Sequence, residues 1–399
     1  MEALLTHDEI QQLRDATKGC ATLVHFNNAG ASLPPDVVVD TAIEYLREEA
    51  LNGGYETEDK YRDKLANVYT SIARLINASA GEVAVTENAS AGWWTAFNGL
   101  SYAPGDEIIT CEMEYVTNVL GFLQAKKLAG VKVTVIPNDV QGNFCIEQLE
   151  DAITPKTKLI AATYIGSTAG NVMPAAAIGE IARRHNILYL LDACQAIGHL
   201  PVDVQHIKCD MLAVTGRKYL RAPRGTGFLY VRKALQDTLN VSSMDGFSAP
   251  HVNSTGFCFR NDARRFELYE KNRALVLGLG CAVDYAITVG IERAWQRIQY
   301  LAALLRSRLQ QLKGVVVHDR GGVLCGIVTF SVQGVNPLLV QSKLAAHRIN
   351  VSVGKAHSTL YYMEKQGLEN NVRASLHYYN TEDEIQLFCE VLTKITSAF

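Results

Sequence analysis

The chain has 399 residues, of which 48% are hydrophobic and 20% are charged, and its formal net charge is −3. This length is enough for two domains and a large core. The small net charge predicts no nucleic-acid partner, and no apolar run approaches the roughly 18 residues of a membrane span. Nine cysteines are scattered without a C-x-x-C pair. We therefore predict no disulfide framework, no metal site and a cytoplasmic location.

Two helical patterns come first, at residues 37–51 and 61–76, where apolar residues recur at helical spacing. Seven short apolar runs follow, most of them separated by helical stretches such as 116–128 and 176–185. Alternation of strands and helices predicts an α/β fold with a mostly parallel, seven-stranded sheet covered on both faces. The predicted strands are residues 83–85, 107–110, 131–136, 159–164, 188–191, 211–214 and 227–231.

The pattern changes near residue 275. A long helical run over residues 274–312 leads into short apolar runs at 315–317, 327–330, 350–353 and 372–378. This order predicts a large α/β domain followed by a smaller α+β domain. We place the large domain at residues 16–275 and the small domain at 276–399, with the N-terminal residues 1–30 packing near the small one.

Two charged residues follow predicted core strands. Asp192 comes directly after the apolar run 187–191, and Lys218 follows the run 211–214. Taken alone, Asp192 could cap a helix and Lys218 could be a solvated surface charge. Ligands of open parallel sheets, however, bind beyond the carboxyl ends of the strands, and a buried carboxylate needs a cation or donor beside it. Pyridoxal phosphate uses both groups, because it needs a lysine for its Schiff base and an acid opposite its ring nitrogen.

The surrounding sequence resembles the class V branch of fold-type I pyridoxal-phosphate enzymes, which includes cysteine desulfurases, selenocysteine lyases, kynureninases and isopenicillin epimerases. The family pattern of D-x-x-Q followed by S/T-G-H/R-K reads here D-A-C-Q at 192–195 and T-G-R-K at 215–218. The segments HFNNAGASLPP at 25–35 and VRASLHYYNTEDEI at 372–385 are also similar to the family. The resemblance implies pyridoxal 5'-phosphate as cofactor, an amino acid as substrate and a homodimer with shared active sites.

The resemblance also implies the roles of individual residues. Lys218 is expected to hold the cofactor and remove the α-proton, and Asp192 is expected to pair with the ring nitrogen. Gln195 and either Ser167 or Thr168 are expected at the phenolic oxygen, and the sequence does not decide between the last two. The phosphate is expected to contact Ala89, Ser90, Thr215 and Arg217. Cys194 is expected against one face of the cofactor ring and Tyr115 against the other. Tyr115 is also counted among the expected catalytic residues.

Three residues are implied for the substrate. Arg373 corresponds to the family's carboxylate-binding arginine, since arginine holds carboxylates with two hydrogen bonds. Asn28 could assist it, and Arg221 could line the entrance. Structural alternatives stay open for several positions: Arg373 as a strand-edge charge, Tyr115 as a core or interface residue, Gln195 as an exposed helix residue and Cys194 as a small packing residue.

One absence bears on the reaction. Cysteine desulfurases of this family carry a nucleophilic cysteine on a loop before the C-terminal R-x-S, but residues 351–365 contain none, and His357 stands near that point. The segments at 52–56 and 216–231 are similar to C–S lyases of the hercynylcysteine sulfoxide lyase type. The sequence therefore predicts a C–S lyase that acts by β-elimination on an S-substituted cysteine or its sulfoxide. The alternative is a class V aminotransferase or epimerase acting on another amino acid.

Overall fold

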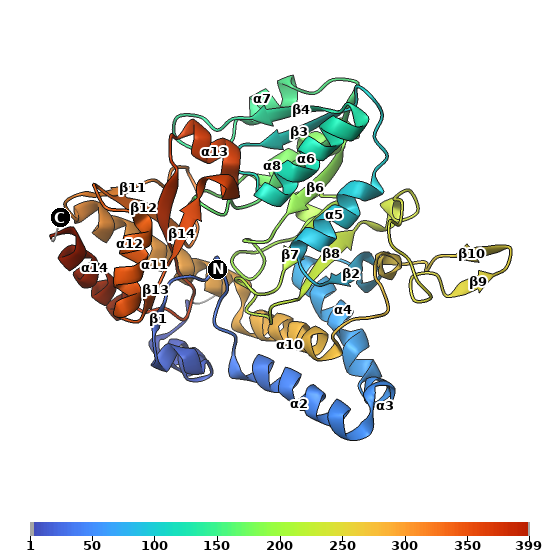
Figure 1. The fold of residues 1–399 in the computed structure, drawn as a ribbon, viewed down its shortest axis with the longest axis horizontal. Helices are drawn as coiled ribbons and strands as arrows, with labels where there is room; N and C mark the ends of the chain where they lie inside the picture. Colours follow the sequence, from blue (N-terminus) through green and yellow to red (C-terminus); the bar gives the residue numbers. More distant parts are fainter. Residues whose placement is uncertain (1–3, 398–399) are drawn as a thin grey trace.

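The computed structural model describes residues 4–397, and its largest element is a seven-stranded sheet in the order β2-β8-β7-β6-β5-β3-β4 (Figure 1). Only β8 runs antiparallel to its neighbours; the pairs among β7, β6, β5, β3 and β4 are all parallel. The predicted α/β fold with a mostly parallel sheet is confirmed. The strands are β2 Val83–Thr86, β3 Glu107–Cys111, β4 Lys132–Ile136, β5 Thr157–Thr163, β6 Leu188–Asp192, β7 Met211–Thr215 and β8 Gly227–Val231.

Both faces of this sheet are buried. Leu190 of β6 packs with Trp93 on one face, whereas Leu191 belongs to the core cluster on the other face. Because neighbouring strand residues point to opposite faces, each strand must be apolar throughout, which explains the continuous apolar runs in the sequence. One face is covered by α5 Ala89–Gly99 and α6 Val116–Ala129, and the other by α4 Arg62–Ile76, α8 Ala175–Arg184 and α10 Arg273–Val289.

A second, four-stranded antiparallel sheet has the order β11-β12-β15-β14. Its own core cluster joins strand residues such as Phe330 and Val372 to Leu305, Val340 and Phe388 of three covering helices. These elements are β11 Val315–Val317, β12 Ile327–Val332, β14 Ser352–Lys355, β15 Asn370–Ser375, α11 Ile291–Gln311, α12 Pro337–Ala346 and α14 Glu382–Thr396.

The helical run predicted over residues 274–312 is broken into α10 and α11, which are bent by 77° relative to each other. The break falls at Gly290, whose φ of 87° is accessible to glycine at little cost. Since α10 packs on α4 and on α2 Asp36–Asn52, the change of packing partner occurs at Gly290 rather than near residue 275. The division into two domains remains a prediction. Within residues 4–397, no single helix is long and apolar enough to cross a membrane.

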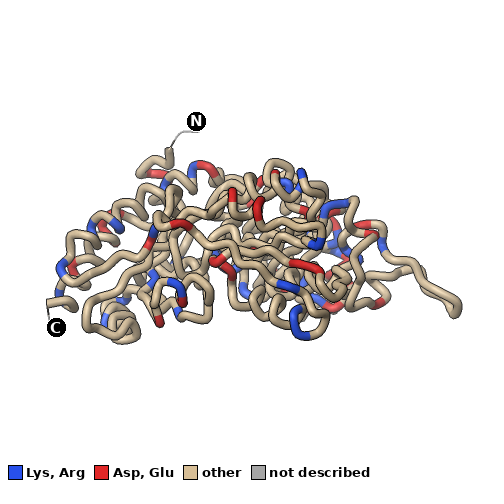
Figure 2. The backbone as a smooth tube through the Cα atoms, turned by 90° about the horizontal axis from the view of Figure 1, so that it is seen from above, with Lys and Arg blue, Asp and Glu red and all other residues tan. Residues whose placement is uncertain are grey.

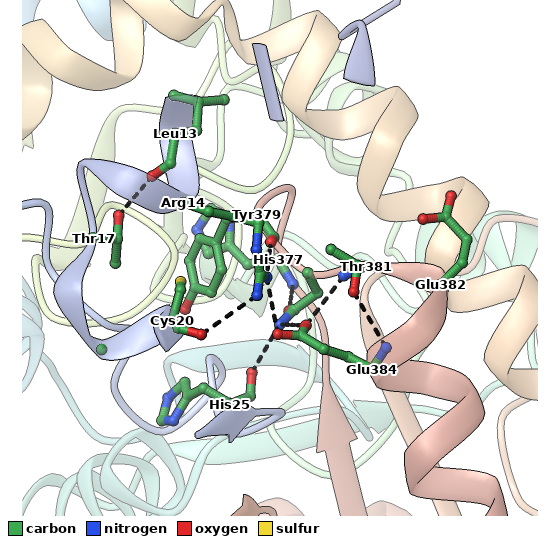
Figure 3. A network of polar contacts seen from close by, with 12 residues as sticks. Leu13, Arg14, Thr17, Cys20, His25, His377, Tyr379, Thr381, Glu382 and Glu384 are labelled. Carbon is green, nitrogen blue, oxygen red and sulfur yellow. Dashed lines mark hydrogen bonds and ion pairs between the residues drawn. The ribbon is translucent and has the colours of Figure 1, made fainter. Parts of the chain in front are cut away.

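The N-terminal segment lies beside the small sheet. β1 Val24–His25 pairs in parallel with β13 Ile349–Asn350. In the network of Figure 3, Arg14 of α1 His7–Asp15 donates to the Tyr379 carbonyl at 2.7 Å and pairs with Glu384 at 2.9 Å. These contacts join the two ends of the described chain in one unit.

A hairpin of β9 His251–Asn253 and β10 Gly256–Cys258, which the sequence analysis did not predict, projects from the body (Figure 1). Its strand residues are all exposed, and residues 246–259 contain no Lys, Arg, Asp or Glu. Charged residues of both signs are scattered over the rest of the backbone (Figure 2). The remaining elements are α3 Gly54–Lys60, α7 Ile146–Asp151, α9 Val204–Ile207, α13 Leu360–Lys365, and the 3-10 turns η1 Lys18–Ala21, η2 Ala80–Glu82, η3 Lys233–Leu235, η4 Ala263–Phe266 and η5 Ala356–Thr359.

Candidate active site

A cavity of about 160 Å³ lies at the carboxyl ends of β6 and β7. A larger hollow of about 460 Å³ lies at the opposite end of these strands, beside Asp210 and Arg232, and contains none of the predicted site residues. Ligands of such sheets bind at the carboxyl ends, so we assign the smaller cavity as the candidate active site. Ten predicted residues line it: Ala89, Ser90, Tyr115, Ser167, Asp192, Cys194, Gln195, Thr215, Arg217 and Lys218.

Asp192 is the last residue of β6, and only 4% of its surface is exposed. Its Oδ1 accepts a hydrogen bond from the Cys194 backbone N–H at 2.9 Å, and its Oδ2 accepts one from Asn118 Nδ2 at 3.1 Å. The two donors fix the carboxylate at the cavity wall. Carboxylate oxygens can each accept a further hydrogen bond, so Asp192 is able to receive a protonated ring nitrogen.

Lys218 follows β7 and is buried, with Nζ 5.8 Å from the centre of the Tyr115 ring. Burial lowers the pKa of Lys218 below its ordinary value, and the neighbouring Arg217 adds to this shift. The ammonium makes no hydrogen bond or ion pair with residues 4–397. A buried amine without such a partner is costly, and an amine that releases its proton readily is a better nucleophile and base. Both properties fit a lysine that binds a carbonyl cofactor covalently.

The start of α5 is suited to an anion. Asn88 is the N-cap and accepts a hydrogen bond from the Ala91 N–H at 2.9 Å, and Ala89 and Ser90 of the first turn line the cavity. Free N–H groups and the helix dipole favour a phosphate at this position. Arg217, whose guanidinium also donates to the Gly30 carbonyl, adds a positive charge to the same cavity. These donors fit the phosphate of pyridoxal phosphate.

Gln195 and Ser167 lie where the phenolic oxygen is expected. Gln195 Nε2 donates to the Ala29 carbonyl at 3.1 Å, and its buried Oε1 has no hydrogen-bond partner among the described residues. Ser167 lines the cavity and lies 3.2 Å from the Thr359 hydroxyl, whereas Thr168 is fully buried outside the cavity lining. Of the two residues left open by the sequence, Ser167 is therefore the one that the cavity reaches.

Arg373 on β15 does not line the cavity itself but contacts the lining residue Ser167 from the small sheet. Its Nη1 donates to the Ser167 carbonyl at 2.6 Å and its Nε donates to Ser352 Oγ at 2.9 Å. Burial lowers the pKa of Arg373 to about 10, with Arg217 contributing, so the guanidinium stays charged at neutral pH. Its Nη2 makes no hydrogen bond to the described residues and remains available to a substrate carboxylate.

Arg221 and Asn28 do not line the cavity. Arg221 has a left-handed backbone (φ 62°) and a buried guanidinium, which donates to the Leu33 carbonyl, the Tyr378 hydroxyl and Thr17 Oγ1 at 2.6–2.8 Å. All three of its nitrogens are thereby engaged. Asn28 is fully buried and joins the N-terminal segment to β15 through the Ser375 carbonyl at 2.7 Å. The structure thus gives both residues contacts within the fold in place of the predicted substrate contacts.

Sequence reasoning missed a pair of buried polar residues beside Asp192. Asn118 lies one helical turn after Tyr115 in α6, and its Nδ2 donates to Glu114 Oε2 at 2.7 Å as well as to Asp192. The helix start in MEYVTN was the available signal, because residues three and four apart share one helix face. The cavity-lining residues that were not predicted are Asn88, Thr117, Asn118, Thr163 and Ile165.

The segment at 351–365 does not line the cavity, but it contacts the lining residue Ser167 and is joined to the large-sheet unit by two side-chain contacts. Thr359 contacts Ser167, and Lys365 pairs with Glu112 at 2.8 Å. His357 on this segment is exposed. The only cysteine that lines the cavity within residues 4–397 is Cys194, and burial raises the pKa of its thiol well above the ordinary value. A protonated thiol is a poor nucleophile.

Comparisons with known proteins agree with this geometry. A family model for aminotransferase class-V matches residues 24–388. A probable cysteine desulfurase from Methanothermobacter thermautotrophicus is 31% identical over 379 residues, which cover 93% of this chain and 94% of that protein. The apo structure of a cysteine desulfurase from Thermococcus onnurineus NA1 has a TM-score of 0.93 at 26% identity over 100% of both chains. A cystine C–S lyase in complex with cysteine persulfide has a TM-score of 0.85 at 23% identity, covering 94% of this chain and 98% of that one.

Proposed function

Because the chain belongs to the aminotransferase class V family and is a pyridoxal-phosphate-dependent lyase, we propose that it cleaves the carbon–sulfur bond of an S-substituted cysteine or its sulfoxide. The observation that carries the proposal is a complete Lys218–Asp192 site facing a segment, residues 351–365, that contains no cysteine. Such a site supports loss of a sulfur substituent from the substrate but offers no protein thiol on that segment to capture sulfur.

Two residues supply the proton chemistry in this proposal. When bound, pyridoxal phosphate withdraws electrons from the α-carbon of an amino acid, so that an α-proton can be removed and a β-substituent expelled. Lys218, with its lowered pKa, accepts the α-proton at Nζ. Asp192, held by Cys194 and Asn118, keeps the ring nitrogen protonated by accepting its hydrogen bond.

Arg373 binds the substrate carboxylate in this proposal. Its two bonds to Ser167 and Ser352 orient the guanidinium, and the free Nη2 provides the donor. Tyr115, which lines the cavity, would lie against the cofactor ring, and Lys218 would serve as the proton acceptor because a phenol is a weak acid near neutral pH. The site therefore binds, orients and deprotonates the α-carbon with residues of both sheets.

A desulfurase acting through a protein-bound persulfide is the rival supported by the relatives' names. The buried Cys194 thiol is protonated at neutral pH and is a poor acceptor of sulfur. A solved neighbour described as a cystine C–S lyase has the same fold, so the fold is compatible with elimination from an S-substituted cysteine. These points favour elimination, with sulfur leaving on the substrate's own substituent.

The proposal includes a homodimer. The projecting β9–β10 hairpin is uncharged and exposes Val252 (70%) and Phe257 (50%). Helix α2 adds exposed Val37 (49%) and Leu46 (48%). Apolar surface of this kind is typical of an interface between subunits. Sedimentation of the enzyme at micromolar concentration tests this state, and a monomer would contradict it.

The test of the reaction is a product balance. Elimination from a thioether of cysteine consumes one water and yields one thiol, one pyruvate and one ammonia. We expect equimolar pyruvate and thiol over many turnovers with S-alkyl cysteines, without added keto acid or reductant. Conversion of one equivalent per site that resumes only with a keto acid would indicate an aminotransferase, and a protein-bound persulfide formed from free cysteine would indicate a desulfurase. Either result rejects the proposal.

A further inference from the structure

Glu114 is a buried acid that the proposed reaction does not use. It lies between β3 and α6, its exposed fraction is 0%, and no ion pair involves it within residues 4–397. Its Oε2 accepts the Asn118 Nδ2 hydrogen bond at 2.7 Å, its Oε1 meets the weak thiol donor of Cys111 at 3.7 Å, and the Thr163 hydroxyl is a further donor. An ionised carboxylate in such a place lacks the cationic partner that normally offsets its burial.

The same amide serves a second carboxyl group. Asn118 Nδ2 lies 2.7 Å from Glu114 Oε2 and 3.1 Å from Asp192 Oδ2, so the two acids are neighbours with one amide between them. An amide carries two hydrogens and can satisfy one oxygen of each acid. Two adjacent carboxyl groups in a buried site do not both ionise readily, because like charges repel strongly there.

Asp192 is the one charged group that faces Glu114. The other titratable groups near it are Cys111 on β3, Tyr189 on β6 and Tyr361 on α13. Burial raises the pKa of all three, so they are uncharged at neutral pH. Burial first, and then the Asp192 charge, raise the pKa of Glu114 to about 8. Asp192 has the backbone N–H of Cys194 as a donor in addition to the shared Asn118 amide.

We propose that Glu114 holds a proton at neutral pH and is a positioning residue, which as an uncharged acid fixes the Asn118 amide against the ionised Asp192. Asp192 is then the only anion beneath the position of the cofactor ring. Loss of the Glu114 proton would place a second anion beside Asp192 and draw the shared amide toward Glu114. The electrostatic environment of the ring nitrogen would change with it. This last step rests on the role proposed above for Asp192.

The proton itself is measured by infrared spectroscopy of the holoenzyme. We expect a carbonyl band of a protonated carboxylic acid at pH 6.5, which disappears with a midpoint near pH 8 and is absent from Glu114→Gln. Glu112→Gln is the matched control, because Glu112 is also buried but pairs with Lys365; its band should match the wild-type band. Absence of the band in the wild type, or its persistence in Glu114→Gln, overturns the proposal.

The positioning role is measured by the visible absorbance of the bound cofactor between pH 6.5 and 9.5. We expect a step near pH 8 in the wild type and in Glu112→Gln, and the loss of this step in Glu114→Gln, which should match the wild-type spectrum at pH 7. Identical titrations of wild type and Glu114→Gln would refute the role even if the infrared band is present. Failure of the role proposed for Asp192 is recognised separately, since Asp192→Ala would then retain its cofactor and activity, and failure of the proposed reaction is recognised by the product balance.

Discussion

The two walls of the cavity are built differently. The wall from the large sheet consists of residues at fixed strand and helix ends, and Asp192 and Lys218 are both at least nine-tenths buried. The small-sheet wall lies behind the lining residue Ser167: Arg373 on β15 and Thr359 of the segment at 351–365 contact Ser167 but do not line the cavity themselves, and His357 of that segment is exposed. In the function proposed above, the large sheet supplies the cofactor chemistry and the small sheet contacts the substrate.

If the large-sheet wall supplies the chemistry, the greatest loss follows from Lys218→Ala. We expect activity to fall below detection and borohydride to fix no cofactor to the protein, because no other described amine lines the cavity. Peptide mapping of reduced wild type checks the attachment site. Lys271→Ala is the control, since Lys271 is another buried lysine with a pKa lowered by burial, to about 7. Cofactor attached to Lys271 would overturn the assignment.

Asp192→Ala comes next in expected effect. Removing the anion leaves the ring nitrogen unpaired and weakens electron withdrawal, so we expect roughly a 100-fold or greater loss of kcat together with weaker cofactor binding. Cofactor affinity is measured by absorbance titration and kcat by pyruvate release. Activity within a few-fold of wild type would show that the large-sheet wall does not depend on this acid.

Arg373→Ala tests the small-sheet wall. A charge-assisted hydrogen bond from the free Nη2 to a carboxylate contributes about 1.5–3 kcal/mol, so we expect KM to rise between roughly 10-fold and 150-fold. Cofactor affinity should stay near the wild-type value, because the contact belongs to the substrate side. The exposed Arg224 provides a control, and Arg224→Ala should leave KM almost unchanged. Equal loss of cofactor affinity in Arg373→Ala would erase the contrast between the two walls.

The buried proton of Glu114 makes the free energy of unfolding depend on pH. The folded protein keeps the Glu114 proton up to about pH 8, whereas the unfolded chain loses it near its ordinary pKa of 4.5. Between these values the folded state binds more protons, so the free energy of unfolding falls as pH rises. Glu114→Gln removes this pH dependence. The Tm of the variant should therefore rise by about 2–5 °C relative to the wild-type Tm as the pH is raised from 5 to 8. A constant difference in Tm across that range contradicts the buried proton.

The smallest effect is expected for Cys194→Ala. Cys194 lines the cavity, but its protonated thiol takes no part in the proposed elimination. We expect kcat/KM within about threefold of wild type, which corresponds to less than roughly 1 kcal/mol. Pyruvate release with an S-alkyl cysteine measures it. Loss of activity in Cys194→Ala would indicate that the Cys194 thiol accepts sulfur during the reaction.

The sequence predicted the sheet better than the connections. Strands such as β6 and β7 are apolar throughout because both faces are buried, and this signal is local. The bend at Gly290 and the β9–β10 hairpin depend on tertiary contacts that periodicity does not contain. Asp192 and Lys218 were accessible to prediction because strand ends meet at one edge of the sheet.

The arginines show why part of the site was not predictable. Arg217 and Arg221 lie four residues apart in one glycine-containing stretch, yet Arg217 lines the cavity and Arg221 does not. The left-handed backbone at Arg221 belongs to a turn in which its N–H bonds to the Lys218 carbonyl, and the side chain ends in a junction with Thr17. Residue type and spacing carry no information on such a turn. The Glu114–Asn118 pair was missed for a related reason, since its importance arises only from the proximity of Asp192.

The pairing of β1 with β13 has a consequence for biosynthesis. His25 and Asn350 are partners although 325 residues separate them. At translation rates of about 5–20 residues per second, the N-terminal strand waits roughly 16–65 s for its partner to be synthesised. During that interval Phe26, which is fully buried in the finished protein, is exposed to solvent. The nascent chain therefore carries the segment around Phe26 without its partner strand through most of its synthesis.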